Sequence, residues 1–196
     1  GFTKQGTGKL TLTGANNYTG GTTVGDGTLE GDATSLQGDI LNNAVVVFDQ
    51  STPGTYAGIM SGSGTLNKKG PGVLTLTNDS SGFSTGKVNI DTGTLLVKGK
   101  LGGELMVSPN AILGGNGTVI GNVTNNGSVQ PSVDYDNPLT IDGNYTQTGE
   151  LVIPLNKAGA LDVTGTATLD GVLRVNPGSG VYLQGTTYTF LTAEAV

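Results

Sequence analysis

One tripeptide of this sequence has the residues of a known catalytic motif. Asp91-Thr92-Gly93 follows the apolar Ile90, as in the active-site motif of aspartic proteases. That chemistry needs two aspartates that share one proton, and the sequence holds no second Asp-Thr-Gly, so a dimer would have to supply it. The matching position of a similar stretch earlier in the chain reads Gly25-Asp26-Gly27. A repeated turn therefore explains the tripeptide better than catalysis does.

Two glycine-rich stretches resemble ligand-binding loops, but both are incomplete. Gly114-Gly115-Asn116-Gly117 begins like the calcium-binding repeat GGxGxD, yet Val119 stands where the carboxylate ligand is needed. The stretch 82–87 (GFSTGK) is one residue shorter than a phosphate-binding loop and continues with Val88 in place of Ser or Thr. Both stretches are predicted to be turns, and we expect neither a metal site nor a cofactor site.

The residue inventory argues against catalysis. Histidine and cysteine are absent, which excludes Ser-His-Asp and Cys-His catalysis and the common zinc sites. A carbohydrate-active enzyme, the alternative that remains, would need carboxylates grouped on one face. Asp134 and Asp136 instead lie in a proline-flanked loop, and Arg174 is expected to project to solvent or to pair with Asp162 or Asp170. We therefore predict that the chain is not an enzyme and has no catalytic residues.

The elements that position these residues belong to a repeat. The stretch 6–13 (GTGKLTLT) returns at 70–77 (GPGVLTLT), an offset of 74 − 10 = 64 positions for the Leu10/Leu74 pair. Downstream, VGDGTL at 24–29 corresponds to IDTGTL at 90–95. A repeat of both strand pattern and glycine placement predicts a stack of similar units rather than a globular core.

Composition agrees with a turn-rich β-protein. The 196 residues include 35 glycines, with 5% aromatic and 12% charged residues. The net charge is −6, and only nine basic residues are spread along the chain, which argues against nucleic acid as a partner. The absence of cysteine fits an extracellular bacterial protein that does not depend on disulfides. No apolar run approaches the length of a membrane helix, and the first residues have no signal-peptide pattern. Because the sequence begins at Gly1, we expect it to be a fragment of a longer protein.

Short strands separated by Gly- and Asn-rich turns recur about every 20 residues, as in a parallel β-helix. We predict an all-β fold, a right-handed single-stranded parallel β-helix of about eight or nine turns that is about 40 Å long. A β-sandwich is the alternative, because strands spaced by about 8–12 residues also predict that fold. Paired asparagines at corners favour the β-helix, since their amides can stack in ladders: Asn16, Asn17, Asn42, Asn43, Asn125 and Asn126.

The chain is expected to divide near Asn144. Residues 1–144 would form the stem, and residues 145–196, where Gly and Asn become rarer and larger apolar residues gather, would form terminal turns and a β-hairpin cap. Plain continuation of the turns is the alternative. Within the stem, the connections 30–43 and 49–62 are either contact loops that extend from the rod or irregular turns.

Three stretches of the sequence resemble a known family. Residues 6–29, and a second copy within 62–97, closely resemble the passenger-associated transport repeat of bacterial autotransporters, which places the copies near 2–30 and 61–97. The stretch 111–131 resembles the segment before the C-terminal region of such passengers. Residues 160–180, followed by YTFLTA at 188–193, are similar to the pertactin-like autochaperone region.

This resemblance implies type V secretion, with the passenger at the bacterial cell surface or outer membrane, or secreted after cleavage. It implies a structural stem and an autochaperone that nucleates passenger folding and supports translocation, with the protein's own C-terminal outer-membrane β-barrel translocator as partner. An adhesin or self-association module that binds host or neighbouring-cell surfaces is the alternative. The residues of the folding nucleus and cap would be Leu161, Val163, Leu169, Leu173, Val175, Tyr188 and Phe190.

Overall fold

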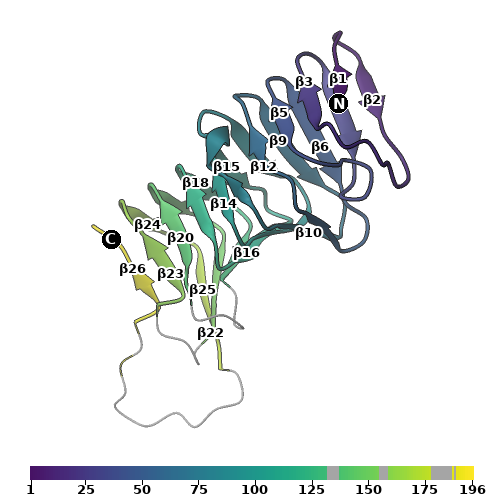
Figure 1. Cartoon of the computed structure of the whole chain (residues 1–196). Helices are drawn as coiled ribbons and strands as arrows, with labels where there is room; N and C mark the ends of the chain where they lie inside the picture. The colour runs from purple at the N-terminus through teal and green to yellow at the C-terminus, as the bar shows by residue number, and fades with distance from the viewer. Residues whose placement is uncertain (132–136, 155–158, 178–186, 188) are drawn as a thin grey trace.

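The computed structural model describes residues 1–131, 137–154, 159–177, 187 and 189–196, and it shows a stack of coiled turns with the two chain ends at opposite ends of the stack (Figure 1). In each complete turn the chain passes through three short strands, one on each of three faces. Neighbouring strands of a face come from successive turns and pair in parallel. The parallel β-solenoid predicted from the sequence is therefore confirmed, and the β-sandwich alternative is excluded. The handedness of the coil stays a prediction.

Face 1 is formed by the first strand of each turn. The ladder is interrupted between β8 and β11, where the Met60 amide donates 2.9 Å to the Ser80 hydroxyl instead of to a backbone carbonyl. The strands of face 1 are β1 Phe2–Lys4, β3 Thr22–Val24, β5 Ile40–Asn42, β8 Met60–Ser61, β11 Asp79–Ser80, β14 Lys100–Gly102, β17 Thr118–Ile120, β20 Leu139–Asp142, β23 Leu161–Val163 and β26 Leu191–Thr192.

Face 2 is a continuous sheet of nine strands, one for each successive turn. Its strands are β2 Lys9–Thr11, β4 Thr28–Gly31, β6 Val45–Asp49, β9 Thr65–Lys69, β12 Lys87–Ile90, β15 Glu104–Val107, β18 Val123–Asn125, β21 Tyr145–Gln147 and β24 Ala167–Leu169.

Face 3 begins at the third turn and contains seven strands. These are β7 Gly54–Tyr56, β10 Val73–Leu76, β13 Gly93–Val97, β16 Ala111–Gly115, β19 Ser128–Pro131, β22 Glu150–Pro154 and β25 Val172–Asn176. One short 3₁₀ helix, η1 (Ser81–Phe83), lies between β11 and β12. No helix in the described part of the chain has the length and apolar character needed to cross a membrane.

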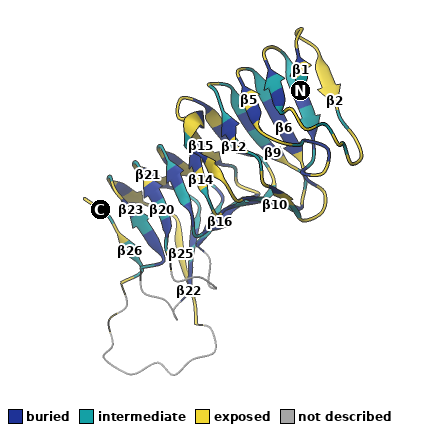
Figure 2. Ribbon diagram, viewed as in Figure 1, coloured by how far each residue is buried: buried dark blue, intermediate teal, exposed yellow. Residues whose placement is uncertain are grey.

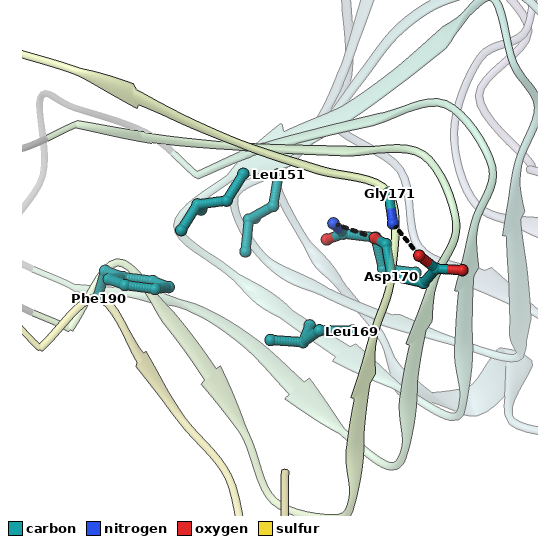
Figure 3. Close-up of a pocket in the computed structure, with 7 residues that line it drawn as sticks. Leu151, Leu169, Asp170, Gly171 and Phe190 are labelled. Carbon is teal, nitrogen blue, oxygen red and sulfur yellow. Dashed lines mark hydrogen bonds between the residues drawn. The ribbon is translucent and has the colours of Figure 1, made fainter.

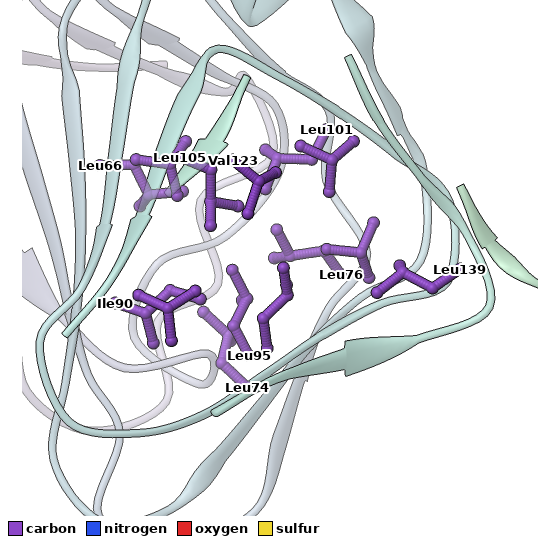
Figure 4. Packing of buried hydrophobic residues seen from close by; sticks show 14 of the residues in the cluster. Leu66, Leu74, Leu76, Ile90, Leu95, Leu101, Leu105, Val123 and Leu139 are labelled. Carbon is purple, nitrogen blue, oxygen red and sulfur yellow. The ribbon is translucent and has the colours of Figure 1, made fainter. Parts of the chain in front are cut away.

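The interior is filled by the alternate residues of each strand, as expected when one side of a sheet is buried. Leu66, Leu74 and Leu95 have no exposed surface, and Figure 4 shows leucines from all three faces pointing into one interior. Figure 2 shows that burial is high through the middle of the stack and lower at its ends. Each fully buried Leu or Val contributes about 1.5–3 kcal/mol of transfer free energy.

Turn length varies at the corners while the strands stay in register. The paired residues Leu29 and Val46 are 17 positions apart, whereas Leu66 and Val88 are 22 positions apart. The longer turn accommodates η1, whose Phe83 is fully buried. The connections 30–43 and 49–62 contain strands β5, β7 and β8, so they are irregular turns rather than extended contact loops.

The β-hairpin cap expected at the C-terminus stays a prediction, and the described strands near it are parallel. In the described part of 145–196, β25 pairs in parallel with β22, and β26 pairs in parallel with β23. These strands therefore extend the solenoid, since apolar positions at the same spacing fit a further turn as well as a hairpin. Residues 178–186 and 188 lie outside the described residues.

Truncation of a stacked leucine should destabilise the solenoid far more than truncation of its outward neighbour. We expect Leu95→Ala to lower the free energy of unfolding by about 2–5 kcal/mol, because Leu95 is fully buried between Leu74 and Leu113 and would leave a cavity. Urea unfolding followed by circular dichroism measures the loss. The control, Leu96→Ala, changes a half-buried outward residue, and equal losses in the two variants would contradict this packing.

Candidate functional site: the C-terminal turns and the repeat corners

The residues predicted to form the folding nucleus fall into two groups. Leu161 and Val163 of β23 are buried, with exposed fractions of 0% and 2%, because β20 and β26 flank them in face 1. Leu169, Leu173 and Val175 occupy inward positions of the last complete turn, yet they are 42%, 47% and 43% exposed. Strands β24 and β25 are the last described strands of faces 2 and 3, and among the described residues no further strand covers the far side of these side chains.

Two of these exposed residues line an open hollow of about 270 Å³ at the C-terminal end of the stack. Leu169 and Leu173 face it together with Leu151, and Phe190, which is half-buried and packs on the core, lies across it (Figure 3). The structure thus brings Leu169, Leu173 and Phe190 together, and it does not place Val175 on this hollow. Tyr188 lies outside the described residues.

A buried polar chain connects the last three turns of face 2. The Asn125 amide donates 3.0 Å to the Tyr145 hydroxyl, which donates 2.9 Å to Gln147 Oε1. The Gln147 amide in turn donates 2.9 Å to the Asp170 carbonyl oxygen, the contact drawn in Figure 3. Burial raises the pKa of the Tyr145 hydroxyl, while the hydrogen bond from Asn125 opposes that shift. The side chains therefore fix the order of three consecutive turns.

The protease-like tripeptide is a repeat corner. Gly93 has a φ of 71°, and its counterpart in the first repeat copy, Gly27, has a φ of 68°. The Thr92 carbonyl accepts a hydrogen bond from the buried Lys68 ammonium at 3.0 Å. The prediction that Asp91-Thr92-Gly93 is a repeated turn is confirmed.

The other candidate chemistry is likewise part of the scaffold. Gly114 and Gly115 end β16, and Asn116 and Gly117 connect it to β17. The stretch 82–87 begins in η1 and ends in β12. Arg174 projects to solvent, one of the two expected alternatives, with 67% of its side chain exposed. The expected partners Asp162 and Asp170 are wrong, because Arg174 pairs with Val152 in register and its Nε donates 2.6 Å to Glu150 Oε1 on that strand. Among the described residues no group of three potential ligands could hold a metal ion. Asp134 and Asp136 lie outside the described residues.

Two lysines that match no functional motif are buried. Lys4 is 6% exposed and Lys68 is 0% exposed. Both stand at the same position of the repeat, with the 64-residue offset that also separates Leu10 from Leu74. This equivalent position in both repeats is the sequence feature that could have indicated a shared role. The sequence did not predict burial, because a lysine beside glycines at a corner is ordinarily solvated.

The outer surface of face 2 carries a regular rank of small polar side chains. Thr124, Thr146 and Thr168 are exposed and stand in register on successive strands. Two turns before Thr124, Asn89 donates 2.9 Å to Asn67 in the same outward rank, and Met106 lies between Asn89 and Thr124 with 42% exposure. This asparagine pair lies on strands and involves none of the paired corner residues from which an asparagine ladder was expected; the corner residues Asn42 and Asn125 donate instead to the carbonyls of Thr65 and Glu150.

Comparison with known proteins agrees with the repeat-built solenoid. The family model of the passenger-associated-transport-repeat matches residues 2–30 and 66–97, the two stretches that contain the buried lysines. The chain is 31% identical to the Adhesin BmaC autotransporter of Brucella suis biovar 1 (strain 1330) over 245 aligned residues, which cover 98% of this chain and 7% of that protein. It is 32% identical to the uncharacterized protein YuaQ of Escherichia coli (strain K12) over 123 residues, covering 58% of this chain and 9% of that protein.

No solved structure is a significant match for the chain. The chain spans less than a tenth of the length of either relative. The chain is thus a parallel β-solenoid that contains two matches to the passenger-associated-transport-repeat and is similar to an autotransporter along nearly its whole length.

The polar chain at Tyr145 predicts a specific alkaline sensitivity. Because the folded-state pKa of Tyr145 is raised above its ordinary value of 10.0, the stability it contributes is complete below pH 10 and is lost as pH rises further. We expect Tyr145→Phe to lose about 1–3 kcal/mol at neutral pH, because Asn125 and Gln147 each lose a partner. The variant should then lose less additional stability than the wild type at about pH 11.

Urea midpoints at the two pH values measure both effects. Tyr18→Phe is the control, because Tyr18 is half-exposed. Identical pH dependence in the wild type and Tyr145→Phe would contradict the burial of this hydroxyl.

Proposed function

We propose that this chain is a structural stem of an autotransporter passenger, and that residues 145–196 form an autochaperone segment that nucleates folding and supports translocation across the outer membrane. Its partner would be the protein's own C-terminal outer-membrane β-barrel, and its location the cell surface or, after cleavage, the medium. The transport repeats at 2–30 and 66–97 within a continuous solenoid carry this proposal. An enzymatic role is not proposed, because the motifs that suggested chemistry form corners.

The direction of the buried hydrogen bonds supports growth of the solenoid from its C-terminal end. Five buried side-chain nitrogen donors stand at strand ends, and each donates to a carbonyl one turn further along the chain. They are Lys4, Asn42, Lys68, Asn125 and Gln147. A folded turn therefore presents carbonyl oxygens to the turn that precedes it in sequence, and water can solvate these oxygens until that turn arrives.

Growth in the opposite direction would leave each of these donors without its acceptor in the following turn until that turn forms, and a neutral donor shielded from water without that acceptor costs about 1–3 kcal/mol. The two ammonium groups would keep their acceptors in their own corners. The Tyr56 hydroxyl donates in the opposite sense, 2.8 Å to Gly38 O in the preceding turn. Ala33 N, in contrast, donates 3.0 Å to Gln50 Oε1 of the next turn, and both ammonium groups also donate to a carbonyl of the next turn. Each added turn contacts mainly its neighbours, so little loop entropy is lost at each step.

Refolding of matched truncations tests this role. We expect the full chain to regain its β-structure after dilution from denaturant, and the chain truncated after Asn144 to fail, because Asn125 loses both Tyr145 and Glu150. The control lacks residues 1–39, which removes the first two turns and leaves the C-terminal segment intact. Far-UV circular dichroism and protease resistance follow folding. Equal refolding of the two truncated chains would contradict the autochaperone role.

A second candidate function is adhesion or self-association. Its support is the similarity to an autotransporter named as an adhesin and the exposed threonine rank on face 2. A flat, regular polar surface of this kind could contact glycans or proteins of a host or neighbouring cell.

We expect the fluorescently labelled chain to bind cultured epithelial cells or bacteria that display the same chain. Simultaneous substitution of Thr124, Thr146 and Thr168 by Lys should lower this binding at least about tenfold, through lost contacts and added repulsion. The control places lysines at Thr118, Thr140 and Thr192 on face 1. Binding of the wild type no higher than that of the control would argue against adhesion by this segment.

A further inference from the structure

Each transport repeat contains a buried lysine whose ammonium group is satisfied by backbone carbonyls alone. Lys68 Nζ donates to Lys69 O at 2.7 Å, to Gly70 O at 2.8 Å and to Thr92 O at 3.0 Å. The three ammonium hydrogens thus have three acceptors. Two belong to the lysine's own corner, and the third belongs to the same corner of the next turn. Burial lowers the pKa of Lys68, and nearby Asp49 opposes this shift.

Lys4 makes the same set of contacts in the first repeat. Its Nζ donates to the carbonyls of Gln5 and Gly6 in its own corner, and to Asp26 O of the next turn at 3.0 Å. In the described part of the chain, neither lysine forms an ion pair with a carboxylate. The arrangement is therefore a property of the repeat and not an isolated event.

A glycine one turn further on completes each arrangement. A Cβ atom at Gly27 would lie 2.7 Å from Lys4 Nζ and 2.4 Å from Gly6 O. A Cβ atom at Gly93 would lie 2.8 Å from Lys68 Nζ and 2.3 Å from Gly70 O. Both glycines also have positive φ angles, which side chains disfavour. The corner that receives the ammonium group must therefore carry glycine for two independent reasons.

The two copies lie at different edges of the solenoid. Lys4 stands at the corner between β1 of face 1 and β2 of face 2, whereas Lys68 stands between β9 of face 2 and β10 of face 3. The same contacts form at both edges. Their geometry is thus encoded by the local sequence and is independent of the face on which the repeat falls.

Most other corners give little information about which turns should be neighbours. In the inner rank that contains Lys68, the adjacent residues are Phe48 and Ile90, followed by Val107. Apolar residues of this kind can stack on one another in several orders, which leaves the register of similar turns weakly specified. A buried ammonium group cannot be stacked on an arbitrary neighbouring turn in this way, because its burial without acceptors costs several kcal/mol.

We propose that the pairs Lys4–Gly27 and Lys68–Gly93 are register locks, which determine which turn stacks on each transport repeat and in what alignment. The lysine supplies a charge that only a carbonyl-presenting corner can accept, and the glycine excludes corners that carry a side chain. The lock selects the neighbouring turn wherever folding begins, so it does not depend on the autochaperone proposal.

Disulfide trapping in full-length chains tests the lock, because the natural sequence contains no cysteine. The pair Asn67→Cys and Asn89→Cys reports the native register, since these residues are partners on β9 and β12. The pair Asn67→Cys and Met106→Cys reports a skipped turn, because the two positions are two strands apart and too far to be bridged natively. Mass spectrometry after oxidative refolding quantifies both disulfides.

We expect Lys68→Met and Gly93→Ala each to lower the yield of the native disulfide at least about fivefold and to raise the yield of the skipped-turn disulfide. Lys69→Met is the matched control, because Lys69 is the exposed neighbour on the same strand, and it should keep the wild-type pattern. If both Lys68→Met and Gly93→Ala form the native disulfide in the same yield as the wild type, the lock is overturned, even if the stability of the variants falls.

If Lys68→Met prevents folding, Lys4→Met decides the question, because it changes only the first turn and leaves the other turns to fold. Here Thr3→Cys with Thr23→Cys reports the native register, and Thr3→Cys with Leu41→Cys reports the skipped turn. Loss of the native disulfide with an otherwise unchanged circular dichroism spectrum supports the lock, and its retention overturns the lock. Lys9→Met, at an exposed lysine, is the control.

Discussion

Every turn of this solenoid depends on its neighbours to satisfy the backbone at its corners. Each complete turn changes direction at corners whose peptide groups are partly shielded from water, and the amides there donate to carbonyls of an adjacent turn. For example, Gly25 N donates to Lys4 O at 2.9 Å, and Asp91 N donates to Lys68 O at 2.9 Å. Buried side chains use the same carbonyl-rich corners as acceptors. A single turn is therefore incomplete by itself, and stability resides in the interfaces between turns.

This dependence explains why the apparent chemical motifs lack chemistry. A corner that receives a neighbouring turn needs glycine and small polar residues, the residue types from which catalytic and phosphate-binding loops are also built. In Asp91-Thr92-Gly93 the position restricted by Lys68 is Gly93, while Thr92 contributes its backbone carbonyl, as Asp26 does in the first repeat. What such a scaffold can present is length, a defined order of turns, and regular exposed ranks such as the threonines of face 2.

Much of this architecture could be predicted from the sequence. The all-β solenoid and its repeat corners follow from the 64-residue repeat, the alternation of apolar residues and the glycine-rich turns. Three features could not be predicted. The burial of Lys68 depends partly on the Thr92 carbonyl, which lies 24 positions further along the chain. The partner of Arg174 is Glu150 because register, not proximity in sequence, sets that pair. The third feature is the parallel pairing of β25 and β26, since a strand's sequence pattern does not reveal the direction of its partner.

The central claim is that the turns assemble in a fixed order, with each new turn docking its buried donors onto carbonyls of the turn that follows it in sequence. Pulsed hydrogen exchange during refolding, read by mass spectrometry for each turn, tests this most directly. We predict that amide protection appears first in β20–β25 and then spreads turn by turn toward β1. Protection that appears first near β1, or simultaneously in all turns, would contradict the account.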